Sequence, residues 1–253
     1  MKLSSHLTPI LMAAMASAGL ARIALVLLLA SQMPMAAAAE AIVKPAFKQP
    51  APDALVVVLP PLRSADSAID NALTTQVLRS RLALVPFKVA TLSEENCMAL
   101  LTQAVVAVSA DAGKGAPLPR AELAFKAMSA LSQAICEEVK CHLVLQTKVV
   151  QRQAKLQGRY ADWDGVRIPV RDLIAVDRAF LFEMEGSTPA WSVEVVAFDA
   201  DGKLAFLTHG GLALAFERDK QRSSASPNLL RLRDEAAIRV AVDAALAHLT
   251  FQK

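Results

Sequence analysis

A long helix pattern that runs directly into a strand pattern is the strongest constraint that this sequence places on its fold. Between Arg120 and Val139, apolar residues recur at four-residue spacing with Met128 beside them: Leu123, Ala127, Leu131, Ile135 and Val139. The segment HLVLQTKVV, residues 142–150, follows at once and is rich in β-forming residues. A helix joined to a strand in this way predicts an α/β protein in which helices cover a sheet.

The residues before this helix predict a β-α-β unit. The apolar run from Ala54 to Leu59, ended by two prolines, is typical of a strand covered on both faces. We expect a helix from Ser67 to Leu82, a short strand over 87–92, and a second helix that starts at Ser93 and reaches about Val106.

The second half predicts strands and one closing helix. Strand patterns cover 142–150, 154–160, 190–198 and 203–216, and residues 190–198 alternate with period two. Ser226 is expected to cap the last helix, with Pro227 at its first position and its end near Leu249. The predicted order, β-α-β-α-α-β-β-β-β-α, is a mixed α/β fold: a mixed sheet covered by helices, in a single domain over 54–253.

The N-terminal residues 1–41 are predicted to be a cleaved secretory signal peptide. Arg22 precedes the apolar run IALVLLLA, and a proline and small residues follow. Cleavage after Ala39 or after Ala41 fits the small-x-small rule, and residues 42–53 form a proline-rich linker. The apolar run is shorter than the roughly 20 residues that a membrane-spanning helix needs. With no cysteine near the cleavage region, we expect a periplasmic protein without a lipid anchor or a transmembrane segment.

The charge balance argues against a nucleic-acid partner. Removing Lys2, Arg22 and Glu40 with the leader takes 27 basic and 24 acidic residues to 25 and 23. Nucleic-acid-binding domains usually show a clustered basic face, and this chain also lacks interleaved arginine and aromatic residues.

Three cysteines remain after the leader: Cys97, Cys136 and Cys141. Cys136 falls in the last turn of the expected helix and Cys141 at the start of the next strand, so a disulfide between them is geometrically feasible in an oxidising compartment. The alternative is that all three are small buried apolar residues. Their spacing does not resemble a zinc site.

Two Asp-x-Asp-Gly segments, Asp162–Gly165 and Asp199–Gly202, resemble parts of a calcium loop. Such a loop needs a bidentate Glu six residues after the glycine, where this chain has Arg171 and Thr208. Asp-Gly is also the preferred sequence for a turn with positive φ. We therefore interpret both segments as turns.

Motifs for nucleophilic or phosphate chemistry are not found, so the sequence predicts no catalytic, cofactor-binding or metal-binding residue. There is no Gly-x-Ser-x-Gly elbow, and prolines occupy the place where a phosphate loop would follow the first strand. The three histidines after the leader, His142, His209 and His248, lack ligand or relay spacing. Gly210-Gly211 inside a strand pattern predicts a bulge or a close backbone approach.

Several of these segments resemble one group of envelope proteins. LVVVLP, the following helix, AICEEVKCHLVLQTKVV and the β-rich end are similar to the amino-terminal domain of TolB, the curli-secretion lipoprotein and the outer-membrane lipoprotein activators of penicillin-binding proteins. WSVEVVAFDADGKLAFLTHGG resembles their final hairpin, and ADWDGV with the later GG resembles uncharacterised exported proteobacterial proteins. The chain departs from the lipoproteins in lacking a lipobox cysteine, and in having Lys140-Cys141-His142 where they have Gly-Ala-Asp.

Because that group works by binding and assembly, the resemblance implies a non-catalytic accessory or adaptor protein in envelope biogenesis or transport, with another envelope protein as its partner. Tyr160 and Trp163 are the candidate partner-binding residues, and a Trp in this segment is either a core residue or an interface anchor. One alternative is an exported hydrolase with a divergent site around Asp162, Asp164 and His209. Another is a periplasmic module that binds a small ligand.

Overall fold

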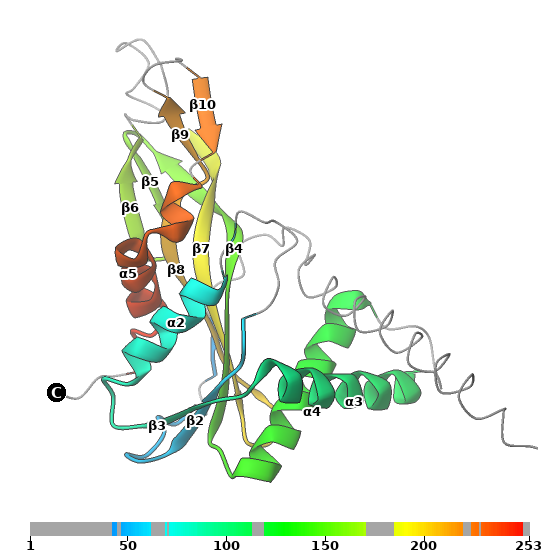
Figure 1. Cartoon of the computed structure of the whole chain (residues 1–253). Helices are drawn as coiled ribbons and strands as arrows, with labels where there is room; N and C mark the ends of the chain where they lie inside the picture. The colour runs from blue at the N-terminus through cyan, green and yellow to red at the C-terminus, as the bar shows by residue number, and fades with distance from the viewer. Residues whose placement is uncertain are drawn as a thin grey trace, which may run out of the picture.

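One mixed sheet forms the centre of the molecule, with its main strands in the order β1-β8-β7-β4-β2-β3 (Figure 1). These strands are β1 (Ile42–Val43), β2 (Leu55–Val58), β3 (Lys88–Thr91), β4 (Leu143–Gln157), β7 (Glu185–Asp199) and β8 (Leu204–Leu214). β2 is parallel to β3 and β4, whereas β4, β7 and β8 form an antiparallel meander. The predicted mixed sheet is confirmed.

The computed structural model describes residues 42–44, 47–61, 69, 71–112, 119–170, 185–219, 224–227 and 229–249. The expected signal peptide, residues 1–41, lies outside them.

Helices cover both faces of the sheet, as the sequence predicts. α2 (Asn71–Leu82) and α5 (Glu235–Ala245) pack on one face, and α3 (Glu94–Ala112) and α4 (Arg120–Val139) pack on the other (Figure 1). β2 contributes to both layers, because Val56 and Val58 join the core under α2 and α5 while Val57 joins the core under α3 and α4. This explains its continuous apolar sequence.

β4 is longer than the sequence predicts, because it joins the two strands expected at 142–150 and 154–160. Its full length pairs with β7, from Leu143 opposite Asp199 to Gln157 opposite Glu185. The intervening polar residues, Gln151 to Gln153, resemble a break in sequence but continue the strand, with Gln151 exposed and the other two half-buried.

A short hairpin, β5 (Tyr160–Trp163) and β6 (Val166–Pro169), pairs with the end of β4 and folds over the α3/α4 face of the meander. Its inner side contributes Ala161 and Trp163 to a small apolar core. The other residues of this core are Ala154 and Leu156 of β4, Ala190 of β7 and Leu214 of β8. Four-residue strands carry too short an alternation to be recognised, and the sequence predicts only the turn between them.

The start of the last helix is predicted wrongly. Ser226 and Pro227 belong to β10 (Ser224–Pro227), which pairs with β9 (Phe216–Asp219). A 3-10 turn, η3 (Leu230–Arg233), follows, and the residue that caps α5 is Asp234. The Asp234 carboxylate accepts hydrogen bonds from the backbone N–H groups of Ala236 and Ala237, at 3.0 and 3.2 Å.

The predicted Cys136–Cys141 pair lies at disulfide-bond distance, with the Cα atoms 4.5 Å apart. It joins the end of α4 to the start of β4 across Lys140, which takes the left-handed conformation that ends many helices. Cys97 is buried without a disulfide partner. Its burial, and to a smaller extent the negative charge of Glu94, raise the pKa of its thiol to about 11.

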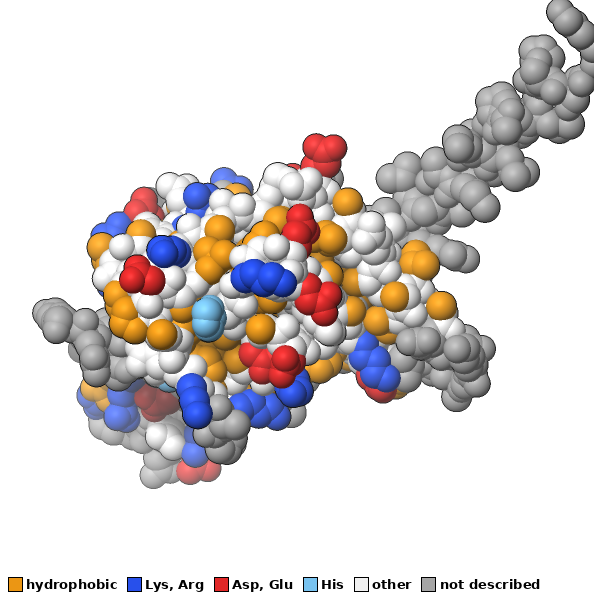
Figure 2. Space-filling model, turned by 90° about the horizontal axis from the view of Figure 1, so that it is seen from below, with side chains coloured by type: hydrophobic (Ala, Val, Ile, Leu, Met, Phe, Trp, Pro, Cys, Tyr) orange, Lys and Arg blue, Asp and Glu red, His pale blue; other side chains and the backbone are white. Residues whose placement is uncertain are grey.

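In the described residues, no helix is both long and apolar enough to span a bilayer. At the end of the molecule near β2, β3 and α4, acidic and basic side chains are mixed among apolar ones (Figure 2).

Candidate functional site

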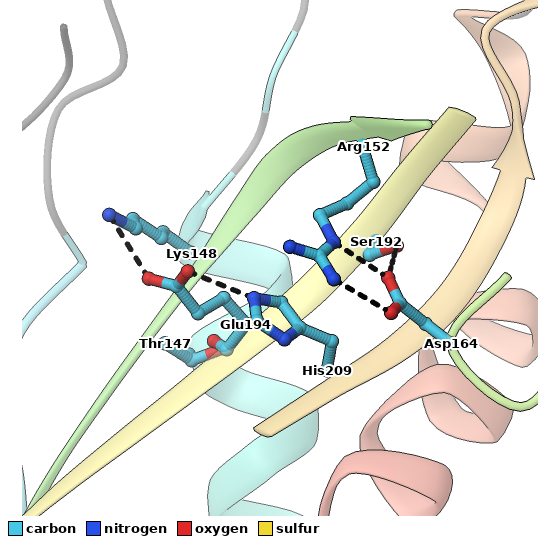
Figure 3. Close-up of polar contacts among 7 residues, drawn as sticks. All are labelled: Thr147, Lys148, Arg152, Asp164, Ser192, Glu194 and His209. Carbon is cyan, nitrogen blue, oxygen red and sulfur yellow. Dashed lines mark hydrogen bonds and ion pairs between the residues drawn. The ribbon is translucent and has the colours of Figure 1, made fainter. Parts of the chain in front are cut away.

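Six residues form a polar cluster on the face of the meander opposite α2 and α5, beside the β5–β6 hairpin (Figure 3). Side chains alternate along a strand, so every second residue of β4 and β7 points to the same face. The cluster takes Lys148 and Arg152 from β4, Ser192 and Glu194 from β7, His209 from β8, and Asp164 from the hairpin turn. Thr147, next to Lys148 on β4, points to the α2/α5 face.

Glu194 is the centre of one half of this cluster. It is paired in register with Lys148 on β4 and with His209 on β8, so the three side chains form a row across adjacent strands. One carboxylate oxygen lies 3.1 Å from the Lys148 Nζ, and the other lies 3.1 Å from the His209 Nε2. The Thr147 hydroxyl donates to the Glu194 carbonyl oxygen at 3.0 Å.

The surroundings keep Glu194 ionised. Burial alone would raise the pKa of this carboxyl, but the hydrogen bond with His209 and the charge of Lys148 outweigh it and hold the pKa below its ordinary value. A carboxylate only accepts hydrogen bonds, which places a proton on the His209 Nε2. The other ring nitrogen, Nδ1, is buried and has no hydrogen-bond partner among the described residues.

Asp164 is the centre of the other half. The Arg152 guanidinium donates two hydrogen bonds to its carboxylate, each 3.1 Å long, and the Ser192 hydroxyl donates a third at 2.6 Å. The side chains of Arg152 and Asp164 are only 10% and 12% exposed. A backbone bond from the Gly211 N–H to the Asp164 carbonyl oxygen, 3.0 Å, fixes the turn against β8.

Both Asp-x-Asp-Gly segments contain turns, as predicted. Asp164 and Gly165 have φ values of 41° and 80°, typical of a two-residue hairpin, and Gly202 has φ 70° in the turn between β7 and β8. In the second turn the Asp199 carboxylate accepts the backbone N–H groups of Asp201 and Lys203. Among the residues that the structure describes, no group of three or more His, Cys, Asp or Glu side chains could hold a metal ion.

The Gly210-Gly211 pair lies where two layers approach the sheet, which confirms the prediction of a close backbone contact. A Cβ at Gly210 would collide with the Ala241 carbonyl oxygen of α5. A Cβ at Gly211 would lie 2.8 Å from a methyl carbon of Val166, on the hairpin at the opposite face. The β7–β8 register also shifts here, as a bulge requires.

The two candidate partner-binding residues have different surroundings. Trp163 is buried at 6% exposure in the small core under the hairpin, and its indole Nε1 donates to the Trp191 carbonyl oxygen at 3.2 Å. Tyr160 is 41% exposed, and the Arg167 guanidinium lies 4.6 Å from the centre of its ring. Partner binding by these residues stays a prediction.

Of the three residues considered for a hydrolase, the structure brings Asp164 and His209 to the same cluster. Asp162 lies on β5 and pairs with Arg167, at 3.4 Å, outside the cluster. Within the drawn cluster, Asp164 and His209 have separate partners. The other two histidines are elsewhere: His142 is exposed, and the His248 ring packs 4.2 Å from the Phe206 ring, where burial lowers its pKa.

Sequence reasoning missed Lys148, Arg152, Ser192 and Glu194. The available signal is charge at strand positions that point inward: Glu194 lies among apolar residues in WSVEVVAF, and Lys148 lies in HLVLQTKVV. Two opposite charges in neighbouring apolar strands favour a buried pair.

Protein-family models, curated proteins and solved structures were compared with the chain, and none matched it.

Proposed function

We propose that this protein is a non-catalytic accessory protein of the periplasm that acts by binding another protein of the cell envelope. The observation that carries the proposal is the outer side of the β5–β6 hairpin. There Tyr160 is exposed and stacked with Arg167, while Asp162 holds the same arginine. Tyr and Arg are enriched among the residues that dominate binding energy in protein interfaces.

The inner side of the hairpin supports the proposal, because it holds the outer side in one position. The Trp163 indole, the Asp164 carboxylate and the Asp164 carbonyl each bond to the meander. A contact surface that is already ordered loses less conformational entropy on binding.

The pairing of charged side chains with one another inside the polar cluster also favours binding over catalysis. Asp164 is held by Arg152 and Ser192, and Glu194 is held by Lys148 and His209, with each of these side chains largely buried. Charges engaged in this way join the strands and the hairpin to one another. The expected signal peptide and the resemblance to envelope proteins support the location, and a disulfide suits an oxidising compartment.

The proposal is tested by crosslinking in the native host. A photoreactive amino acid replaces Tyr160 in the exported protein, and Lys203, at the exposed turn between β7 and β8, serves as the matched control position. We expect a specific crosslinked product from position 160 and none from position 203. Purified Tyr160→Ala protein should keep its melting temperature and lose binding to the identified partner. Equal crosslinking from both positions, or unchanged binding by the variant, contradicts the proposal.

A second candidate, the exported hydrolase, is favoured by one contact: the Ser192 hydroxyl lies 2.6 Å from the Asp164 carboxylate, in the cluster that also contains His209. Generic ester, phosphate and peptide substrates, each with and without EDTA, test this candidate. An activity that disappears in Ser192→Ala and in Asp164→Asn, with both variants folded, would replace the binding proposal. We expect the purified protein to give no turnover above the buffer.

A further inference from the structure

The two edges of the sheet differ in whether another part of the chain covers them. At one edge, β1 covers β8 by pairing Ile42 with Leu207 and Val43 with Phe206. Further along β8, the hairpin turn receives the Gly211 N–H. At the other edge, β3 pairs with β2 alone, and in the described part of the chain no strand lies on its outer side. An uncovered edge strand is a template for pairing with another chain.

The outward hydrogen-bonding groups of β3 belong to two residues. The Lys88 N–H donates to the Ala54 carbonyl at 3.0 Å, and the Leu92 N–H donates to the Val58 carbonyl at 3.4 Å, so these residues face β2. Backbone groups alternate in direction along a strand. Val89 and Thr91 therefore direct their N–H and C=O groups away from β2.

This pair of residues is complementary to itself. When a second β3 runs antiparallel, with the two-fold axis through Ala90, Val89 lies opposite the second copy's Thr91, and Thr91 lies opposite the second copy's Val89. Opposite residues of a hydrogen-bonded antiparallel pair exchange both of their backbone bonds. All the outward groups of Val89 and Thr91 on both copies are then satisfied.

The charges at the two ends of β3 favour a second copy over an unrelated strand. Lys88 is exposed at the start of β3, and the exposed Glu94 and Glu95 begin α3, just after its end. The same two-fold axis places Lys88 opposite the second copy's Leu92, beside the second copy's Glu94 and Glu95. Symmetry repeats this attraction at the other end, as a self-complementary interface requires.

We propose that the protein forms a two-fold symmetric dimer by antiparallel pairing of β3 with the β3 of a second copy, which extends the sheet across both molecules. The paired segment is four residues long. Such an interface is at the small end of the range for specific contacts, so the dimer forms and dissociates with protein concentration.

The test is sedimentation equilibrium of the purified protein over a series of concentrations. We expect the apparent mass to rise from that of a monomer to that of a dimer. Val89→Pro removes an outward N–H and no bond to β2, a substitution that edge strands tolerate, and it should abolish the dimer. Val89→Thr keeps the backbone donor and should dimerise as the unsubstituted protein does. A mass that stays monomeric, or a dimer that persists in Val89→Pro, overturns the proposal.

Charge substitutions test the register without a change in the backbone. Lys88→Glu should weaken dimerisation about fivefold, since two exposed ion pairs are replaced by repulsion. Adding Glu95→Lys to the same chain should restore most of the affinity. An unchanged dissociation constant in Lys88→Glu overturns the two-fold arrangement. Tyr160→Ala should leave the dimer intact, so failure of the dimer and failure of partner binding at the hairpin are separate results.

Discussion

Arg152 of β4 donates two hydrogen bonds of equal length, 3.1 Å, to the carboxylate of Asp164 and so attaches the β5–β6 hairpin to the meander. The two residues are twelve positions apart, and a turn with positive φ returns the chain to bring them together. The sequence predicts the turn that contains Asp164, but it does not predict the ion pair with Arg152.

Replacing Asp164 with Asn should separate the turn from the ion pair. Asn tolerates the left-handed conformation, so the turn is kept while the charge is lost. The Arg152 guanidinium then remains largely buried with a weaker partner, and we expect the free energy of unfolding to fall by about 3 kcal/mol. Urea denaturation measures the loss. The control is the surface pair Lys203–Asp201, where Asp201→Asn should leave the free energy of unfolding nearly unchanged. Equal losses in the two variants would contradict a structural role for the Arg152 contact.

Two neighbouring glycines should respond differently to the same substitution. Gly210→Ala sets a methyl group against the backbone of α5 at Ala241, which moves only with its helix, so a loss of about 3 kcal/mol is expected. Gly211→Ala meets the side chains of Val166 and Trp163, which can shift with the hairpin, so the loss should be about 1–2 kcal/mol. Urea denaturation orders the two variants, and Trp fluorescence should change more for Gly211→Ala, because Trp163 lies against it. The reverse order of stability would show that α5 yields more readily than the hairpin.

Periodicity made most of the fold predictable. The helix at 120–139 occurs with the expected bounds, because a long run of apolar residues at helical spacing is a strong local signal. β2 is covered on both faces, as its unbroken apolar run indicates. Ser226-Pro227 gave the wrong helix start, because a cap followed by proline is a local pattern that pairing of β10 with β9 overrides.

The polar cluster was not predictable in the same way. Glu194 meets Lys148 and His209 through the register of β7 with β4 and β8, and register depends on contacts between distant segments. The bend that brings Asp164 to Arg152 depends on a hairpin whose strands are too short to recognise. The sequence therefore indicated Asp164 and His209 as candidate site residues, but it did not indicate the side chains that pair with them.

Glu194 should make stability depend on acid pH. Its folded-state pKa lies below the ordinary value of 4.5, so the unfolded chain binds this proton more readily than the folded one. The stabilisation by the carboxylate is therefore present above pH 4.5 and is lost as the pH falls through the folded-state pKa. Glu194→Gln lacks this carboxylate, and the difference between the unfolding free energies of the two proteins should shrink as the pH is lowered from 7 to about 3. Urea denaturation at each pH measures it. A difference that is constant over this range would mean that His209 and Lys148 do not hold the charged form.

Asn71 should act as a substitute strand partner for β4. β2 ends at Val58, while β4 continues, and the Asn71 side-chain oxygen accepts the Val149 N–H at 2.9 Å at the start of α2. Asn71→Ala leaves this buried donor without an acceptor, and we expect a loss of about 2 kcal/mol in the free energy of unfolding. Asn71→Asp keeps an oxygen acceptor and adds a negative charge at a helix N-terminus, where it is favourable, so its loss should be smaller. Amide hydrogen exchange at Val149 gives a local readout. Protection at this amide should fall in Asn71→Ala and persist in Asn71→Asp, and equal protection in both would mean that β4 holds its register without α2.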